Sequence, residues 1–211
     1  MMKNLDKKTL ILTCIITLLP ILLGLTFYND LPERIAIHWG INNEPNGWAG
    51  KNLFVFAFPI FMVVLQLVCQ IGTKKRQHEA SLPKLYHVVV WIIPALSVIL
   101  YIVTLAVALG KDIDIRKVVC LILGIMFILL GNYIPKTSYT NQNMINLPIR
   151  PENEHVWRVF SRIMGIAFIG EGFLLLVSLF FPPIASVLAI AIFIGLLIGI
   201  SFYGSAISGK K

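Results

Sequence analysis

The stretch Leu85–Leu109, LYHVVVWIIPALSVILYIVTLAVAL, decides the fold class of this chain. It contains no Asp, Glu, Lys or Arg. An α-helix rises 1.5 Å per residue, so about 20 apolar residues are enough to cross the ~30 Å hydrocarbon core of a lipid bilayer. The stretch is therefore predicted to be a transmembrane helix.

Five further apolar stretches have a similar length. The six predicted spans are Thr9–Phe27, Leu53–Ile71, Leu85–Leu109, Val118–Ile134, Ile163–Phe181 and Ile184–Tyr203. Pro182 and Pro183 separate the last two, because a double proline ends a helix and favours a tight hairpin. The sequence thus predicts an all-α integral membrane protein, in which a six-helix transmembrane bundle forms a single domain over residues 1–211.

Composition points to the same class. Of 211 residues, 57% are hydrophobic and 13% are charged, whereas about 25% of the residues in soluble domains are charged. A soluble globular protein of this composition would expose large hydrophobic patches to water, so we expect lipid to surround the chain. The formal net charge of +8 is spread over the loops, and we therefore expect no direct binding to nucleic acid. The three cysteines lie within apolar stretches, which argues against a disulfide framework.

Basic residues predict the orientation, because Lys and Arg are retained on the cytoplasmic side. One alternating set of loops and ends carries 13 of them and the other carries 5. The larger set is Lys3, Lys7, Lys8, Lys74, Lys75, Arg76, Lys84, Lys136, Arg150, Arg158, Arg162, Lys210 and Lys211. Both termini and a loop at 135–162 are therefore predicted to be cytoplasmic, and a loop at 28–52 is predicted to lie outside the plasma membrane.

Small and cyclic residues within the spans predict local features of the bundle. Pro20, Pro59 and Pro94 lie inside spans, where neighbouring helices can satisfy the freed carbonyl, and each marks either a packing kink or a hinge. Small residues recur at every fourth position of the last span: Ala191, Gly195 and Gly199. Such a stripe lets another helix approach closely. We favour a helix of the same chain over a second copy.

The outside loop has the pattern of a small hairpin-like cap. Apolar residues alternate with others along one segment, as in a strand: Ile35, Ala36, Ile37, His38 and Trp39. Turn-forming residues then precede Trp48: Asn42, Asn43, Pro45, Asn46 and Gly47. Trp39 and Trp48 suit the headgroup level of a membrane. The cap is either a lid that seals the bundle or a docking surface for a molecule that arrives from outside.

The cytoplasmic loop contains a predicted interfacial helix. Its start is marked by proline and acidic residues: Pro151, Glu152 and Glu154. Apolar residues then fall on one helical face: Val156, Val159, Phe160 and Ile163. This helix is expected to lie along the inner interface and to run into the fifth span. It either anchors the chain or binds a partner.

Glu171 is the one acidic residue deep in a predicted span. A carboxylate there is costly, so the group should face the bundle and be protonated or hydrogen-bonded. The polar candidates to meet it are Gln66, Gln70 and Asn132. A structural role and a functional role are both open.

Motifs that would indicate catalysis are missing from the sequence. It has no HExxH zinc motif, no GxSxG nucleophile motif and no pair of intramembrane aspartates, and its four histidines are scattered. We therefore expect a protein that is not an enzyme, with no cofactor and no metal site.

Two segments resemble the signature motifs of the SdpI family. LPERIAIHWG at Leu31–Gly40 and NEPNG at Asn43–Gly47 are similar to the motif of that family's first outside loop. GNYIPK at Gly131–Lys136 and NEHVWR at Asn153–Arg158, with Arg162 and Gly165 beyond them, are similar to its second signature. With the six spans, the resemblance covers nearly the whole chain.

The resemblance implies a membrane immunity protein of a Gram-positive bacterium, which binds or blocks a secreted peptide toxin of the SdpC type. It also implies a receptor that, when loaded with toxin, holds a cytoplasmic repressor of the ArsR-like class at the membrane. The expected toxin-binding residues are His38, Trp39, Asn43, Gly47 and Trp48. The expected signalling residues are Asn132, Tyr133, Pro135, Lys136, Asn153, Glu154, Trp157 and Arg162.

The chain departs from the family pattern in the cytoplasmic loop. Met144–Ile149 stands where the family has GIRTPW, and Ser161 stands where it has a histidine. These changes bear on repressor capture more than on toxin recognition.

Two other classes of function compete with immunity: a secondary transporter or peptide exporter that uses Glu171 as a proton site, and a membrane peptidase that destroys the toxin.

Overall fold

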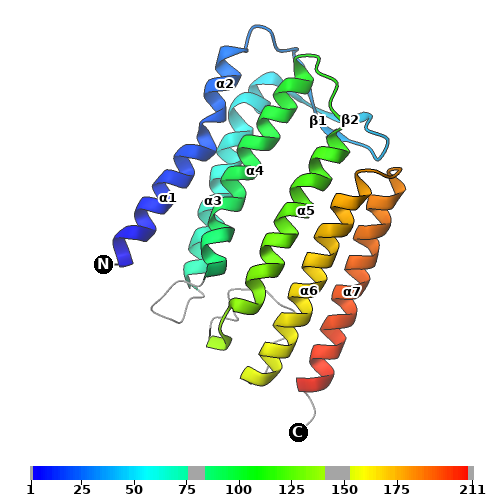
Figure 1. Ribbon diagram of the computed structural model, residues 1–211. Helices are drawn as coiled ribbons and strands as arrows, with labels where there is room; N and C mark the ends of the chain where they lie inside the picture. Colours follow the sequence, from blue (N-terminus) through cyan, green and yellow to red (C-terminus); the bar gives the residue numbers. More distant parts are fainter. Residues whose placement is uncertain (1, 76–83, 141–152, 209–211) are drawn as a thin grey trace. The chain divides into compact units, whose positions relative to one another are not determined.

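Six helices of the computed structural model, which describes residues 2–75, 84–140 and 153–208, are long and apolar enough to cross a membrane (Figure 1). They are Lys7–Thr26, Leu53–Gly72, Leu85–Ala108, Ile115–Lys136, Glu154–Ser178 and Ile184–Tyr203. The predicted all-α membrane fold with six spans is confirmed. The fifth span differs most from its prediction, because its helix already begins at Glu154.

Contacts between residues divide the chain into two units. Unit 1 comprises Met1–Gly72 and Val90–Ile115, and unit 2 comprises Thr73–Val89 and Arg116–Lys211. Among the described residues, unit 1 has one buried apolar cluster and unit 2 has two. The single membrane domain expected from the sequence stays a prediction.

The first span of unit 1 is broken at Pro20. Helix α1 covers Met2–Leu18 and helix α2 covers Pro20–Thr26. Proline has no N–H and cannot donate to the carbonyl four residues earlier. The backbone N–H of Leu19 instead donates to two carbonyls, at 3.1 Å to Ile15 and 3.3 Å to Ile16. The predicted kink at this proline is thus a break between two helices.

A two-stranded antiparallel sheet follows α2 in unit 1. Strand β1 covers Arg34–Trp39 and strand β2 covers Pro45–Gly50. After it, η1 is a π-helical segment over Leu53–Ala57 that leads into α3, Phe58–Lys75. Pro59 lies just beyond η1 and cannot make the usual i→i−4 bond, which accounts for the local change of helix type.

Helix α4, Lys84–Ala108, completes unit 1 with its part from Val90 onward. Its Tyr101 is fully buried and stacks on Phe54, with ring centroids 4.6 Å apart. A Cβ atom added at Gly24 of α2 would lie 1.9 Å from the Tyr101 hydroxyl oxygen, so only glycine fits there. This cluster also buries Ile35, and the sheet is therefore seated on the helices of its own unit.

Unit 2 contains helix α5, Ile115–Tyr133, of which all but the first residue belongs to this unit, and the short 3-10 helix η2, Ile134–Lys136. It also contains α6, Glu154–Ser178, and α7, Ile184–Ser208. The segment that joins α6 to α7 holds the double proline, and the hairpin predicted at that point is confirmed. The segment expected as an interfacial helix forms the first turns of α6, with which it is continuous.

Helices α5 and α6 touch through their backbones at glycines. A Cβ atom added at Gly131 would lie 2.6 Å from the Gly165 carbonyl oxygen, and one added at Gly172 would lie 2.6 Å from the Gly124 carbonyl oxygen. In each helix the two glycines are seven residues apart, which is two helical turns. Glycine at these points lets the two axes approach closely.

The small residues of α7 do not form such a contact. Among the described residues, no atom lies within 4 Å of a Cβ added at Gly195 or Gly199. Both glycines line an open apolar groove instead. Within unit 2 the stripe therefore makes no close helix contact, and the interpretation that it packs against a helix of the same chain stays a prediction.

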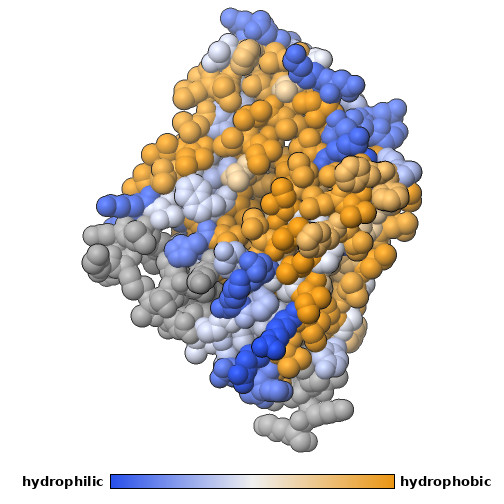
Figure 2. Space-filling view, viewed as in Figure 1, coloured by the Kyte–Doolittle hydropathy of each residue, from blue (hydrophilic) through white to orange (hydrophobic). Residues whose placement is uncertain are grey.

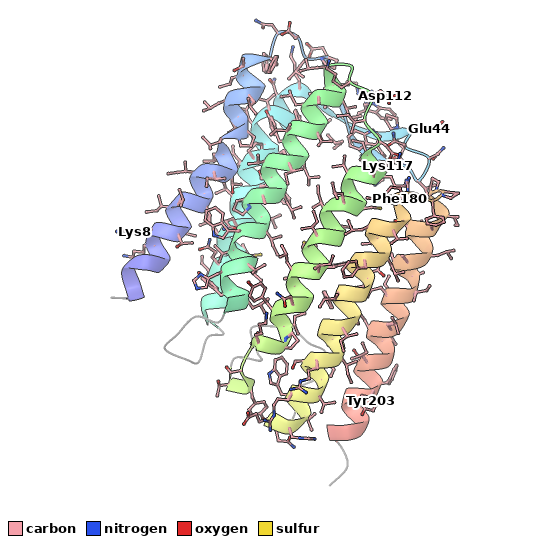
Figure 3. All side chains as sticks on the ribbon, in the orientation of Figure 1. Lys8, Glu44, Asp112, Lys117, Phe180 and Tyr203 are labelled. Carbon is pink, nitrogen blue, oxygen red and sulfur yellow. The ribbon has the colours of Figure 1, made fainter. Side chains whose placement is uncertain are left out.

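The surface follows the expected hydropathy. On the face shown in Figure 2, hydrophobic residues cover the sides of the helices, and hydrophilic residues gather at helix ends and on the hairpin. Within unit 1, Glu44 and Asp112 lie at the hairpin end and Lys8 lies at the opposite end (Figure 3). Apolar helix sides between hydrophilic ends are the arrangement that lipid exposure requires.

Candidate functional site

The first candidate site is the β1–β2 hairpin. Its strands pair Ile35 with Ala49 and Ala36 with Trp48, and Ile35 and Ala49 are both buried. The register shifts after Ala36, so Ile37 is left without a paired residue. Such a bulge turns the strand locally. It accounts for the exposure of Ile37, at 49%, although simple alternation would bury Ile37 with Ile35.

Asn43 holds the turn of the hairpin against the segment that leads into α5. Its backbone has φ 63°, a left-handed conformation that Asn tolerates better than most residues. Its side-chain nitrogen donates to the Ile113 carbonyl at 3.3 Å, and its side-chain oxygen accepts from the Ile115 N–H at 2.8 Å. The first helical residue of α5 thus finds a partner for its otherwise free N–H.

His38 and Gly47 face each other across the two strands. A Cβ atom at Gly47 would lie 3.0 Å from the His38 Cβ, so a larger residue would crowd the histidine. The Nδ1 of His38 donates to the side-chain oxygen of Asn46, and both residues are exposed. Gly47 therefore supports His38, while the His38 ring remains available to a partner.

The two tryptophans of the hairpin differ in exposure. Trp48 is 49% exposed, and Trp39 is partly buried. The apolar surface of the hairpin includes Ile41, which is 51% exposed, besides Ile37. Of the five residues expected to bind a toxin, His38 and Trp48 are thus the most accessible, whereas Asn43 and Gly47 shape the hairpin.

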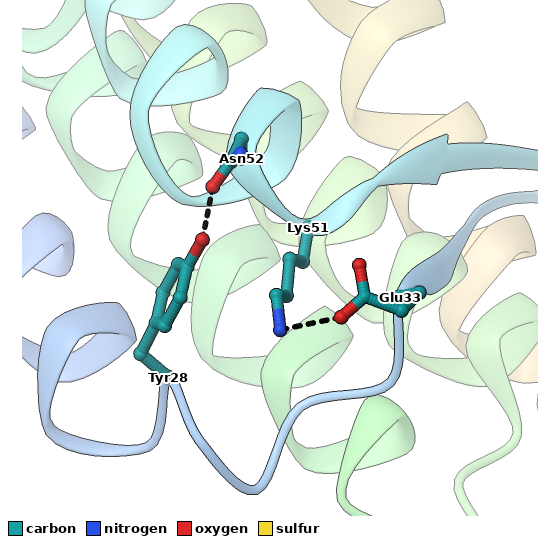
Figure 4. A network of polar contacts seen from close by, with 4 residues as sticks. All are labelled: Tyr28, Glu33, Lys51 and Asn52. Carbon is teal, nitrogen blue, oxygen red and sulfur yellow. Dashed lines mark hydrogen bonds and ion pairs between the residues drawn. The ribbon is translucent and has the colours of Figure 1, made fainter.

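A polar network closes the base of the hairpin (Figure 4). The Tyr28 hydroxyl donates to the side-chain oxygen of Asn52, and the Lys51 ammonium lies 2.7 Å from a Glu33 carboxylate oxygen. The Lys51 nitrogen also lies 4.9 Å from the centre of the Tyr28 ring. The hydrogen bond to Glu33 raises the pKa of Lys51, so this amine stays protonated over the physiological range.

The second candidate site is the joint between the end of α5 and the start of α6. The Lys136 ammonium donates to the side-chain oxygen of Asn132 at 2.9 Å and lies 4.8 Å from the centre of the Tyr133 ring. Pro135 packs on Gly165, because a Cβ atom there would lie 2.6 Å from the Pro135 Cγ. Residues of both halves of the second motif therefore meet.

Trp157 is the centre of this joint. It is 2% exposed and lies in an apolar cluster with Ile134, Phe160 and Met164. Its indole nitrogen donates to the Thr137 carbonyl at 2.7 Å. The tryptophan thus ties α6 to the segment that follows η2, a structural role that its exposed counterpart Trp48 does not share.

The start of α6 is capped as its sequence allows. The Asn153 side-chain oxygen accepts from the Val156 N–H at 2.9 Å, and Glu154 lies in the first turn, near the positive end of the helix dipole. Arg162 is exposed. Pro151 and Glu152, which were expected to mark the helix start, lie outside the described residues, as does the departure from the family pattern at 144–149.

The intramembrane polar residues are buried. Glu171 is 3% exposed in unit 2, and one of its carboxylate oxygens has no hydrogen-bond partner among the described residues. Gln66 and Gln70 of unit 1 are 0% and 5% exposed. Their amide nitrogens donate within unit 1, to the Val90 carbonyl and the Thr13 hydroxyl respectively, both at 2.9 Å. Their expected contact with Glu171 stays a prediction.

The partner of Gln66 explains how α4 tolerates a proline. Pro94 cannot donate to the carbonyl four residues earlier, which is that of Val90. The Gln66 amide nitrogen donates to this carbonyl in place of the missing N–H.

Within the described residues, no group of three or more His, Cys, Asp or Glu side chains could hold a metal ion.

Sequence reasoning missed the contacts that hold both sites. The Trp157 to Thr137 bond joins residues twenty positions apart, and no local pattern announces it. The glycine pairs of α5 and α6 could have been found from their equal spacing. The polar cluster around Gln70 could not, because hydroxyl residues in a span often bond only to their own helix.

Comparisons with known proteins agree with these observations. A family described as a domain of unknown function, DUF1648, matches residues 15–63, which include the hairpin. The chain is 28% identical over 205 residues to a protein named "Immunity protein SdpI" from Bacillus subtilis (strain 168), and the match covers 97% of each chain. No solved structure matches the chain. The similarity along nearly the whole length of this multi-pass membrane protein confirms the resemblance to the SdpI family that its two motifs indicated.

Proposed function

We propose that this chain is a membrane immunity protein that protects its cell against a secreted antimicrobial peptide of the SdpC type. The observation that carries the proposal is its similarity to the immunity protein SdpI over 97% of both chains. The protein acts by binding and not by catalysis. In this proposal the hairpin lies outside the plasma membrane of a Gram-positive bacterium and both termini are cytoplasmic, which the distribution of Lys and Arg supports.

The hairpin is the proposed toxin-binding surface. Trp48 and Ile37 each expose about half of their surface, and exposed aromatic and aliphatic groups next to a membrane suit the apolar face of an amphipathic peptide. His38 adds a polar group on the same hairpin. Asn43 and Gly47 contribute indirectly, because they hold the turn and the strand that carry these side chains.

Survival of a toxin-sensitive strain tests both levels of the proposal. Cells that express the chain should survive the peptide, and cells that express Trp48→Ala at the same level should not. Phe180→Ala is the matched control, because Phe180 is an aromatic residue of unit 2 that is 87% exposed. Should Trp48→Ala protect as well as Phe180→Ala, the hairpin is not the binding surface, although immunity stands. No protection by the unaltered chain would refute immunity itself.

A receptor function for the joint of α5 and α6 is the second part of the proposal. Buried Trp157 supports the fold of this joint, so capture of an ArsR-like repressor would use exposed groups such as Arg162. A tagged repressor of that class from the same genome should be retained at the membrane when the toxin is present. Arg162→Ala should abolish retention, while Arg158→Ala, one turn earlier and also exposed, should not. Equal retention by both variants would remove Arg162 from this role.

Peptide export is the competing function. It is favoured by the buried carboxyl of Glu171, one oxygen of which has no hydrogen-bond partner in the described part of the chain. A proton-coupled exporter needs an ionisable group within the membrane. Glu171→Gln should then stop toxin efflux from loaded vesicles while toxin binding survives. Unchanged protection by Glu171→Gln would exclude export as the mechanism of immunity.

A further inference from the structure

Unit 1 contains a cluster of polar side chains within its membrane-spanning helices. Its members come from three helices and are at most 5% exposed: Thr13 and Thr17 of α1, Gln66 and Gln70 of α3, and Ser97 of α4. None of them carries a charge. Polar residues at this depth are costly unless they are hydrogen-bonded, so the partners of each group can be followed in turn.

The donors of the cluster have partners. The Thr13 hydroxyl donates to the Leu10 carbonyl, at 3.0 Å, and the Thr17 hydroxyl donates to the Thr13 carbonyl, at 2.7 Å. The Ser97 hydroxyl donates to the Thr17 carbonyl at 3.2 Å. That carbonyl belongs to the last turn of α1, where the break before Pro20 leaves it without its helical partner. Each of these three hydroxyl protons is therefore already used in a hydrogen bond to a backbone carbonyl.

Two acceptors of the cluster have no partner. The side-chain oxygens of Gln66 and Gln70 are buried and lack any hydrogen bond within the described residues. The Gln66 amide cannot be turned round, because its nitrogen donates to the Val90 carbonyl. The Gln70 nitrogen donates to the Thr13 hydroxyl, whose own proton goes to the Leu10 carbonyl. The two residues are four apart on α3, so they lie on one face of the helix.

We propose that this cluster is a hydration site, in which ordered water donates hydrogen bonds to the side-chain oxygens of Gln66 and Gln70. A buried carbonyl without a hydrogen-bond donor is energetically costly, and here two such carbonyls lie on one face of the same helix. Water supplies two protons, and buried water in proteins takes sites with two to four polar partners. The hydroxyl oxygens of Thr13 and Ser97 offer further contacts.

Water-edited solid-state NMR of the full chain in lipid bilayers tests the proposal directly. Magnetisation from water should reach the labelled side-chain carbonyls of Gln66 and Gln70 at short mixing times, with signals assigned from their loss in Gln66→Leu and Gln70→Leu. Met164, which is 7% exposed in an apolar cluster of unit 2, is the dry reference. If both glutamines receive magnetisation as slowly as Met164 does, the site is not hydrated.

A double variant gives an independent measurement. Thr13→Val with Gln70→Leu removes both partners of one internal hydrogen bond, a change that is close to neutral when nothing else binds there. If water binds Gln70, the double variant also loses that contact, and its thermal midpoint should fall by about 2–4 °C. A midpoint equal to or above that of the unaltered chain would contradict water binding at Gln70.

Discussion

In unit 1, hydroxyl and amide side chains join α1, α3 and α4, whereas in unit 2 the backbones of α5 and α6 touch at glycines. The first arrangement is seen in the bonds of Gln66 and Gln70 to other helices. The second is seen where Gly172 faces the Gly124 carbonyl. Both solve the same problem, because helices in lipid gain little from burying apolar side chains against one another.

The two units are held together differently because the spans of unit 1 are interrupted by prolines, whereas α5 and α6 are not. The spans of unit 1 contain Pro20, Pro59 and Pro94, and each proline frees a carbonyl that needs another donor. The Gln66 amide of a neighbouring helix supplies a donor for the Val90 carbonyl that Pro94 frees, and the Ser97 hydroxyl donates to the Thr17 carbonyl near the break at Pro20. Helices α5 and α6 contain no proline, so their own bonds satisfy their backbones and close packing can hold them together.

The largest effect is expected where the glycine contact of unit 2 is filled. Gly172→Ala should destabilise the protein by about 1–3 kcal/mol, because its Cβ would overlap the Gly124 carbonyl oxygen and the backbones would have to part. Gly170→Ala is the control, since nothing lies within 4 Å of a Cβ there. Thermal unfolding in detergent should show a lower midpoint for the first variant alone. Equal midpoints would mean that close packing does not hold α5 to α6.

Loss of the Gln66 side chain should remove the hydrogen bond that compensates for Pro94 in α4. Gln66→Leu leaves the Val90 carbonyl without a donor, at a cost of about 1–2 kcal/mol. In a Pro94→Ala background the new N–H can serve this carbonyl, so Gln66→Leu should cost less. A double-mutant cycle of unfolding midpoints measures this coupling. If the two changes prove additive, Gln66 does not compensate for the proline.

Trp157 of unit 2 and Trp48 of unit 1 are expected to differ in how much they contribute to stability. Trp157→Phe should lower stability by about 1 kcal/mol, because it removes the hydrogen bond to the Thr137 carbonyl. Trp48→Phe should leave the unfolding midpoint unchanged, since Trp48 is 49% exposed. Unfolding followed by circular dichroism compares the two variants. A stable Trp157→Phe protein would show that the indole bond does not support the joint.

Asn43 tests how firmly the hairpin of unit 1 is held. Asn43→Gly removes its two side-chain bonds but keeps the left-handed backbone free of strain, whereas Asn43→Ala adds strain at φ 63°. The alanine variant should therefore be less stable than the glycine variant, by about 1 kcal/mol. Protease sensitivity of the hairpin is a suitable measure. Identical sensitivity would show that backbone strain is not important at this turn.

The smallest effect concerns the ion pair between Lys51 and the exposed Glu33. Because the pKa of Lys51 is raised in the folded protein, the stabilisation is present below the unfolded pKa and is lost as pH rises through the higher folded value. Stability near neutral pH should thus be insensitive to pH through this pair, with a slight loss only in strong alkali. Lys51→Met should abolish that alkaline loss. A loss that persists in this variant would have another origin.

Much of the site could be read from local pattern. Turn-forming residues after an alternating segment predicted the hairpin, and Asn153 has the side chain of a helix cap next to acidic Glu154. The position of Ile37 could not be read, because a bulge depends on how two strands pair. The stripe at Gly195 and Gly199 shows a related limit: small residues permit a close helix contact but do not specify the other helix.

The sequence by itself determined the solvent of this protein, the number of its spans and the two polar segments between them. Those properties depend on composition and on runs of about 20 residues, which are local quantities. The tertiary structure alone decided that Gln66 serves the carbonyl freed by Pro94, that Gly131 meets Gly165, and that Trp157 is buried while Trp48 is exposed. Hydrogen bonds and close packing join residues that are distant in sequence, so no local pattern specifies them.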